Sequence, residues 1–393
     1  MNWPVVHVSD VADQIRGVTF GRSESVGVDG PGFTPLFTAS NITEIGLNRD
    51  TDLHIPSAKV QDRQRLRIDD VLITASSGSL SVVGRAVRVD EVDGETFGAF
   101  CKVLRPKKTV DPGYFSHFFR TPSYRARVAH LAAGANINNL KNEDLDQLEI
   151  PLPPLPEQRR IASILDQAGA IRAKRREALE SIDKIADSIF FAFFGDITSN
   201  SMQFEELLLG DVGGLDRGVS RVRPRNRPDL LGGVHPLIQT GDVSSSGGYV
   251  RHFSQTYSDI GLAQSKMWPV GTLAITIAAN IAHTGILTFP ACFPDSVVGF
   301  TSNPAITEVE YVRYWLRSLR ATLERQAPAS AQKNINLAIL RNLRIPVPRL
   351  SVQRLFAEIL REIEAIRDIH QTHLAKLDEL FASLQHRAFR GEL

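Results

Sequence analysis

A proline-rich segment followed by a long heptad pattern occurs twice in this chain. The first copy, IPLPPLPEQ at residues 150–158, matches IPVPRLSVQ at residues 345–353, which begins 195 positions later. The apolar positions after the first copy coincide with those after the second without one gap. Solenoid repeats have periods of roughly 20–50 residues, so a repeat this long predicts duplicated domains instead. We expect each domain to end in a long helix.

The stretches that precede the two proline-rich segments also share landmarks, 201 positions apart. RGV at residues 16–18 returns as RGV at 217–219, and PLFTASNI at 35–42 corresponds to PLIQTGDV at 236–243. The residues between these landmarks differ freely. The pattern indicates that one fold is used twice and that its loops vary.

Each of these stretches has a mixed secondary-structure pattern. Residues Val71–Thr74 and Val82–Val89 are apolar runs separated by turn-forming serines and glycine, which predicts two strands. Residues Tyr114–Leu131 carry aromatic and apolar side chains at helical spacing, which predicts a helix. We therefore expect an α+β fold with two similar mixed α/β domains and two helical segments. Their predicted bounds are 1–150 for the first domain, 151–196 for the first helical segment, 197–345 for the second domain and 346–393 for the second helical segment.

The two helical segments have the pattern of an antiparallel coiled coil. The first predicted helix runs from Glu157 to Phe191 and the second from Val352 to Phe389, which gives rods of roughly 50 Å. Apolar residues alternate at spacings of three and four, as in the a and d positions of a heptad. The predicted seam consists of Ile161, Ile164, Ala168, Ile171, Ile182, Ile185, Ile189, Phe356, Ile359, Ile363, Ile366, Leu377, Leu380 and Leu384.

Antiparallel pairing would relate the two domains by an approximate two-fold axis. The alternative is that each helix lies separately on its own domain, but an apolar stripe this long needs more cover than one small domain offers. Arg175, His370 and His373 interrupt the seam near its middle. These polar residues either set the register, meet a partner protein or remain half exposed.

Composition limits where such a chain works. The sequence contains no run that approaches the roughly 18 apolar residues of a membrane span, and residues 1–7 lack the features of a signal peptide. We therefore expect a cytoplasmic protein that does not associate with a membrane. The two cysteines, Cys101 and Cys292, are too few for a disulfide framework and have no zinc-ligand spacing, so we expect both to be buried.

One segment concentrates positive charge although the net charge of the chain is only +1. Pro224 and Pro228 interrupt this segment and predict a loop. The basic residues are Arg217, Arg221, Arg223, Arg225 and Arg227. A sequence-independent DNA-binding protein usually has a clear basic excess, so any nucleic-acid contact must come from a local cluster such as this one. A solvated loop without a ligand is the other interpretation.

The paired proline-rich segments, each opening a long helix after a variable domain of about 150 residues, resemble those of the specificity subunit of type I restriction-modification enzymes. The resemblance covers essentially the whole chain. In the second copy Ser351 and Val352 stand where the first has Pro156 and Glu157. The first copy is the more specific match, with RIASIL at residues 160–165 continuing the signature.

This resemblance implies a subunit without catalytic activity. Each domain would be a target recognition domain that reads one half of a split, asymmetric sequence in double-stranded DNA, and the helix pair would fix the gap. The implied partners are two methyltransferase subunits, which use S-adenosylmethionine, and restriction or motor subunits, which use ATP and magnesium. The chain itself would need neither a cofactor nor a metal.

Candidate DNA contacts lie at or beside the predicted turns. Arginine can form hydrogen bonds with guanine, asparagine and glutamine can form them with adenine, and hydroxyl groups contact bases or phosphates. In the first domain the candidates are Arg16, Arg22, Ser40, Asn41, Ser76, Ser77, Ser79 and Arg85. In the second domain they are Arg217, Arg221, Arg223, Arg225, Gln239, Thr240, Asn280 and His283. Each residue taken singly is also compatible with a turn-forming or solvated surface role.

Two other functions are compatible with parts of the sequence. Residues 303–306, NPAI, resemble the loop that holds a target adenine in adenine methyltransferases, but the second proline and the aromatic residue are absent. A nuclease is not indicated, because Asp295 lacks a matching acid and lysine, and Asp69-Asp70 has the pattern of a turn before a strand. A non-catalytic coiled-coil adaptor that binds proteins would fit the near-zero net charge.

Overall fold

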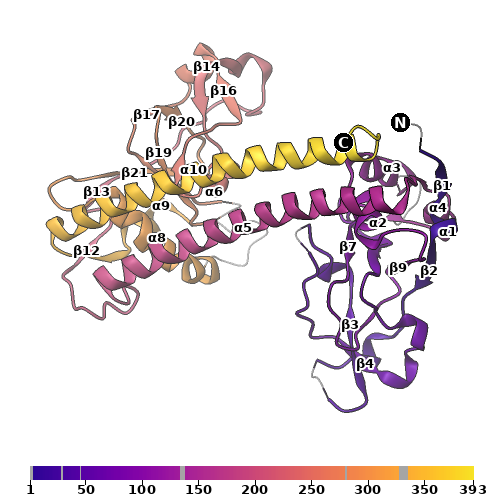
Figure 1. The fold of residues 1–393 in the computed structure, drawn as a ribbon. Helices are drawn as coiled ribbons and strands as arrows, with labels where there is room; N and C mark the ends of the chain where they lie inside the picture. Colours follow the sequence, from indigo (N-terminus) through magenta and orange to yellow (C-terminus); the bar gives the residue numbers. More distant parts are fainter. Residues whose placement is uncertain (1–2, 28–29, 45, 133–137, 279–280, 327–334) are drawn as a thin grey trace. The chain divides into compact units, whose positions relative to one another are not determined.

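The chain folds into two units, each with its own internal contacts. The computed structural model describes residues 3–27, 30–44, 46–132, 138–278, 281–326 and 335–393. The first unit comprises residues 1–178 and 370–393, and the second comprises residues 179–369. Helices α5 (Leu155–Phe194) and α10 (Leu350–Ala388), magenta and yellow in Figure 1, contribute residues to both units.

The first unit is built around an antiparallel four-stranded sheet with the strand order β2-β9-β5-β7. A second sheet has the order β4-β3-β8, and the pairs β1-β11 and β6-β10 complete the strand pairing. The strands are β1 (Val5–His7), β2 (Ala12–Arg16), β3 (Phe33–Phe37), β4 (His54–Pro56), β5 (Val71–Thr74), β6 (Ser76–Ser77), β7 (Ala86–Arg88), β8 (Thr96–Phe97), β9 (Cys101–Pro106), β10 (Asn138–Asn139) and β11 (Glu149–Pro151).

Local sequence explains where the helices and strands of the first unit differ from expectation. The predicted strand Val71–Thr74 is confirmed as β5, but only Ala86–Arg88 of the predicted strand Val82–Val89 is extended, because Gly84 turns the chain with φ +75°. The predicted helix Tyr114–Leu131 is divided by the turn before Pro122, since proline disfavours the helical conformation of the preceding residue. The helices are α1 (Val8–Val11), α2 (Pro112–Phe118), α3 (Pro122–Ala132) and α4 (Asn142–Asp146), with 3-10 turns at Arg22–Glu24, Ala39–Asn41, Ser57–Lys59 and Asp62–Gln64.

The second unit repeats this architecture. Its larger sheet, β13-β21-β18-β19-β15, corresponds in its first four strands to β2-β9-β5-β7, and β16-β14-β20-β17 corresponds in its first three to β4-β3-β8. The strands are β12 (Glu206–Leu208), β13 (Gly213–Arg217), β14 (Leu231–Leu237), β15 (Tyr249–Val250), β16 (Gln255–Tyr257), β17 (Met267–Trp268), β18 (Leu273–Thr276), β19 (Thr284–Leu287), β20 (Ala291–Cys292), β21 (Val297–Ser302) and β22 (Arg344–Pro346).

The helices of the second unit correspond only in part to those of the first. Helix α8 is continuous over 18 residues, where the first unit has the divided pair α2 and α3, because it contains no proline. The helices are α6 (Thr240–Ser245), α7 (Asp259–Ala263), α8 (Val309–Gln326) and α9 (Leu337–Arg341), with a 3-10 turn at Pro228–Leu230. Cys101 and Cys292 are free and buried, as predicted.

Helices α5 and α10 run antiparallel in both units. In the first unit Arg172 Nε donates to Asp378 Oδ1 at 2.6 Å, and in the second Arg367 Nε lies 3.2 Å from Asp183 Oδ1. Contacts later in α5 are therefore made with earlier residues of α10. The predicted antiparallel coiled-coil pairing is confirmed within each unit. Arg175, one of the polar interruptions, lies with its Nη1 3.1 Å from His370 Nδ1.

The predicted seam consists of two rows that differ in exposure. One row is buried or half-buried: Ile161, Ala168, Ile182, Ile189, Phe356, Ile363, Leu377 and Leu384. In the other row Ile164 and Ile359 are half-buried. The remaining members are 51–52% exposed: Ile171, Ile185, Ile366 and Leu380. Each unit thus covers one apolar row of its helices and leaves part of the other open.

The repeated proline-rich segments build one buried hydrogen-bond network in each unit. In the first, Gln158 accepts from the backbone N–H of Asp111 and donates to the carbonyl of Pro153, both at 2.7 Å. In the second, Gln353 makes the corresponding bonds with Glu308 and Pro348, at 3.0 and 2.8 Å. Both glutamines are at most 1% exposed. The residues that carry the sequence repeat therefore attach each long helix to its globular part.

Candidate nucleic-acid interface

The basic cluster of the second unit forms an exposed loop that follows β13. Arg217 ends this strand, and the side chains of Arg217, Arg221, Arg223, Arg225 and Arg227 are all exposed. Asp295 is the acidic residue that anchors the loop: its side chain accepts a hydrogen bond from Arg223 Nη2 at 3.0 Å and another from Arg225 Nη2. One carboxylate thus accepts hydrogen bonds from two guanidinium groups. The loop keeps a local positive charge.

The backbone of this loop is held from beneath, which leaves its side chains at the surface. Gln264 is buried, and its Oε1 accepts from the backbone N–H groups of Arg221 and Val222 at 2.6 and 3.1 Å. At the start of the loop, a Cβ atom on Gly218 would lie 2.3 Å from the carbonyl oxygen of Pro294. Only glycine allows this close approach, and the repeated Gly17 meets the carbonyl oxygen of Gly98 in the same way.

A hollow of about 390 Å³ lies beside the arginine loop and gathers three of the predicted contact residues. Arg225 lines it from the loop, while Gln239 and Thr240 line it from the start of α6. Gln239 Nε2 donates to Gln255 Oε1 at 2.6 Å, so a second glutamine joins the group. Guanidinium and amide groups are the side-chain groups that read guanine and adenine edges in the major groove.

Gln255 was not predicted from the sequence. It lies opposite Leu237 in the β14-β16 pair, so it reaches the hollow only through the register of that pair. His283 lies elsewhere in the unit, in a separate pocket, and burial lowers the pKa of its imidazole, with Arg320 adding to the effect. Asn280 lies outside the described residues.

The predicted contacts of the first unit do not gather in one hollow. Arg16 is exposed on β2 and Arg85 precedes β7, at opposite edges of the four-stranded sheet. Asn41 is buried: its Oδ1 accepts from the N–H of Thr38, and its Nδ2 donates to the carbonyls of Asn48 and Asp50. Its amide therefore shapes the loop.

The remaining candidates of the first unit lie on two turns. Ser40 is exposed, with its hydroxyl 2.8 Å from that of Thr38. Ser76 and Ser77 form β6, and Ser79 is exposed beyond it. Arg85 Nη2 contacts Glu44 Oε1 at 3.4 Å, which links the turn after β5 to the loop that contains Ser40. The side chain of Arg22 lies outside the described part of the structure.

The residues considered for catalysis have structural roles. Asn303 closes the turn between β21 and α8, because its side-chain oxygen accepts from the N–H of Ala305 at 3.1 Å. Asp70 is buried and pairs with Arg105 through both carboxylate oxygens at 2.8 Å, and Asp69 forms the turn before β5, as predicted. Among the described residues, no group of three or more His, Cys, Asp or Glu side chains is placed to hold a metal ion. No helix over the described part of the chain has the length and apolar character of a membrane span.

The sequence and fold are similar to those of known proteins. The family model of the type I restriction modification DNA specificity domain matches residues 1–181 and 203–379. The specificity subunit of the type I restriction enzyme StySPI from Salmonella potsdam is 33% identical, over 100% of this chain and 89% of that protein. The EcoKI specificity subunit from Escherichia coli (strain K12) is 28% identical with the same coverage. The type I S subunit from M. genitalium has a TM-score of 0.60 at 15% identity, covering 99% of this chain and 96% of that one.

Proposed function

The chain belongs to the family of type I restriction-modification DNA specificity subunits, and on this premise we propose that each unit reads one half of a split, asymmetric DNA target. The hollow that brings Arg225, Gln239 and Thr240 together beside a preorganised arginine loop is the observation that carries this proposal. Two units with one topology and different surface side chains suit two different half-sites. Phosphate contacts would position each unit, and base-edge contacts would select the sequence.

The helix pair is the proposed spacer between the half-sites. Helix α5 continues without a break from the residues of the first unit into those of the second, and its 40 residues correspond to roughly 60 Å. A continuous helix resists changes in length. The pair would therefore fix the number of base pairs that are not read.

The exposed apolar row of the helices is the proposed docking surface for methyltransferase subunits. In the first unit Ile171 and Leu380 are 52% and 51% exposed, and in the second Ile185 and Ile366 are 52% and 51% exposed. Ile369, which lies outside this row but three residues after Ile366 on the same helix, is 55% exposed. Regularly spaced apolar side chains at this exposure favour burial against another protein. Because both units have such a row, the proposed stoichiometry is two methyltransferase subunits for each chain.

Ile366 and Ile369 provide a test of this surface. Changing both to glutamate is expected to weaken binding of the methyltransferase subunit at least about tenfold, because two carboxylates would be desolvated in an apolar contact. The measurement is the dissociation constant of the purified pair of proteins. Gln371→Glu, at an exposed position of the same helix, is the control and is expected to bind as the unaltered chain does. Equal losses in both variants would contradict the assignment.

The chemistry of the complex is assigned to the partner subunits in this proposal. The methyltransferase subunits would use S-adenosylmethionine, and the restriction or motor subunits would use ATP and magnesium. This chain would carry out no catalytic step. It would act in the cytoplasm, where the DNA that it reads is located. The adaptor hypothesis is not favoured, because family membership assigns DNA specificity to the chain.

Genome-wide adenine methylation tests the proposal directly. In a methylation-free host that expresses the neighbouring methyltransferase subunit, we expect a two-part motif with a fixed gap to be methylated only when this chain is present. Exchanging residues 1–150 for those of another specificity subunit is expected to change one half of the motif and leave the other half and the gap unchanged. A complex that forms but methylates no motif would contradict the DNA-reading role.

A further inference from the structure

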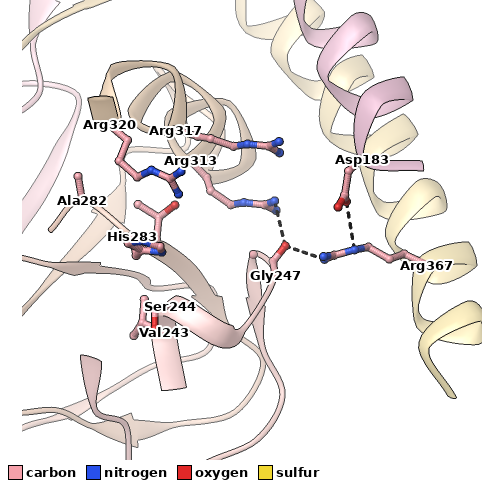
Figure 2. A pocket seen from close by; sticks show the side chains of 12 residues that line it. Asp183, Val243, Ser244, Gly247, Ala282, His283, Arg313, Arg317, Arg320 and Arg367 are labelled. Carbon is pink, nitrogen blue, oxygen red and sulfur yellow. Dashed lines mark hydrogen bonds and ion pairs between the residues drawn. The ribbon is translucent and has the colours of Figure 1, made fainter. Parts of the chain in front are cut away.

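A cavity of about 260 Å³ in the second unit is lined by four arginines. Arg313, Arg317 and Arg320 come from α8, and Arg367 comes from α10 (Figure 2). His283, the residue before β19, also lines the cavity. A water molecule occupies about 30 Å³ in the liquid, so the cavity has room for a small polyatomic anion together with several waters.

Helix α8 concentrates like charges on one face. Arg313, Arg317 and Arg320 occupy positions i, i+4 and i+7, which fall within one narrow stripe of a helix. Like charges at these spacings destabilise a helix by a few tenths of a kcal/mol per pair unless an opposite charge compensates them. Such a stripe is expected where the helix faces carboxylates, as it does here, or another anion.

A carboxylate lies within 4 Å of each of the four arginines, at 3.6 and 3.7 Å for Arg313 and Arg320 and closer for the other two. Arg317 lies 2.8 Å from Asp187, and Arg367 lies 3.2 Å from Asp183. Arg313 is only 3% exposed, yet its nearest carboxylate oxygen, on Glu364, is 3.6 Å away, beyond hydrogen-bond distance. Within the described residues Arg313 Nη1 has no hydrogen-bond partner. A buried guanidinium N–H group without an acceptor is costly.

Two consecutive glycines contact the guanidinium groups of Arg313 and Arg367. The carbonyl oxygen of Gly247 accepts from Arg367 Nη1 at 2.7 Å and from Arg313 Nη2 at 3.4 Å, as Figure 2 shows. A Cβ atom on Gly247 would lie 2.3 Å from Arg367 Nη1, and one on Gly248 would lie 2.1 Å from Arg313 Cζ. The two guanidinium groups therefore pack directly on the backbone, in positions set before any ligand arrives.

We propose that this arginine pocket binds a phosphate group, and that the group is a backbone phosphate of the DNA read by the second unit. Guanidinium groups present planar pairs of N–H donors that match phosphate oxygens, and several of them converge here from two helices. The inference rests on the proposed function. The arginine pocket would hold a DNA phosphate and so position the second unit on the duplex. The hollow beside the arginine loop would contact the bases.

Removal of the two rim arginines tests the pocket. The variant Arg317→Gln/Arg320→Gln is compared with the unaltered chain, each assembled with the methyltransferase subunit, by titration with a duplex that carries the methylated motif over a series of salt concentrations. We expect the slope of log affinity against log salt to become shallower by about one to two, and the methylated motif to stay the same. Arg325→Gln removes the same charge from the same helix outside the pocket and is expected to keep the original slope.

A second experiment distinguishes a DNA phosphate from a free phosphate ion as the ligand of the pocket. Thermal unfolding of the same complexes is followed with inorganic phosphate alone. If the double variant keeps the original DNA slope but loses a stabilisation by inorganic phosphate, the pocket holds a free anion and the DNA assignment is overturned. If neither DNA binding nor phosphate stabilisation differs from the Arg325→Gln control, the pocket binds no phosphate. A failure of the proposed function is distinguishable, because the unaltered complex would then methylate no motif.

Discussion

Replacing Gln353 with leucine is expected to destabilise the second unit by about 3–5 kcal/mol, because several buried polar groups lose their partner at once. Besides the bonds to Glu308 and Pro348, Gln353 accepts from the hydroxyl of Thr307 at 2.9 Å and donates to the carbonyl of Ile306 at 3.2 Å. Leucine has a similar size but neither donor nor acceptor. The measurement is calorimetric unfolding of the full chain, in which the midpoint of the second unit should fall by roughly 6–20 °C.

Two comparisons make this prediction specific. Gln371→Leu places the same substitution at an exposed position of α10 and is expected to change stability by less than about 0.5 kcal/mol. Gln158→Leu should destabilise the first unit less than Gln353→Leu destabilises the second, since Gln158 makes two of these hydrogen bonds and Gln353 makes four. Similar unfolding midpoints for Gln353→Leu and Gln371→Leu would show that the buried network does not hold the helix to its unit.

The repeat predicts more of the fold than the apolar pattern alone. The offset that superposes Gln158 on Gln353 also places Arg172 on Arg367 and Asp183 on Asp378. In the structure these are the two equivalent ion pairs that connect α5 with α10 within the units. The repeat therefore predicts that an ion pair formed in one unit has an equivalent in the other, which the apolar positions and the three polar interruptions alone do not indicate.

Other features depend on tertiary contacts that no local pattern reports. Asp295 anchors Arg223 and Arg225 from 72 and 70 positions away, and Gln255 reaches Gln239 only through the register of β14 and β16. Apolar periodicity also could not show which row of the predicted seam would be covered. Ile161 and Ile171 satisfy the same heptad rule, yet one is fully buried and the other is half exposed, because the globular part and the partner helix cover only one side.

The loop arginines should contribute the largest share of DNA affinity in the second unit. Replacing Arg221, Arg223 and Arg225 together with glutamine is expected to weaken DNA binding by the assembled complex at least about 100-fold, since an arginine on a base edge contributes about 1–3 kcal/mol. Each phosphate contact that is lost should also make the slope of log affinity against log salt shallower by about one. Removing both arginines that pair with Asp295 also leaves this carboxylate unneutralised near the DNA. The measurement is equilibrium binding to the methylated motif at several salt concentrations.

A control at Arg227 distinguishes the effect of removing particular arginines from the effect of removing positive charge from the loop. Arg227 belongs to the same loop, but its Nε and Nη2 both donate to the carboxylate of Asp229, at 3.0 and 2.6 Å. Arg227→Gln is therefore expected to reduce affinity by less than about threefold, because it removes a pair that is already neutral. Substituted duplexes complete the argument: the triple variant should lose discrimination in one half of the motif and keep it in the other. Equal losses in both halves, or a loss as large for Arg227→Gln, would mean that the loop supplies only general positive charge and does not read the second half-site.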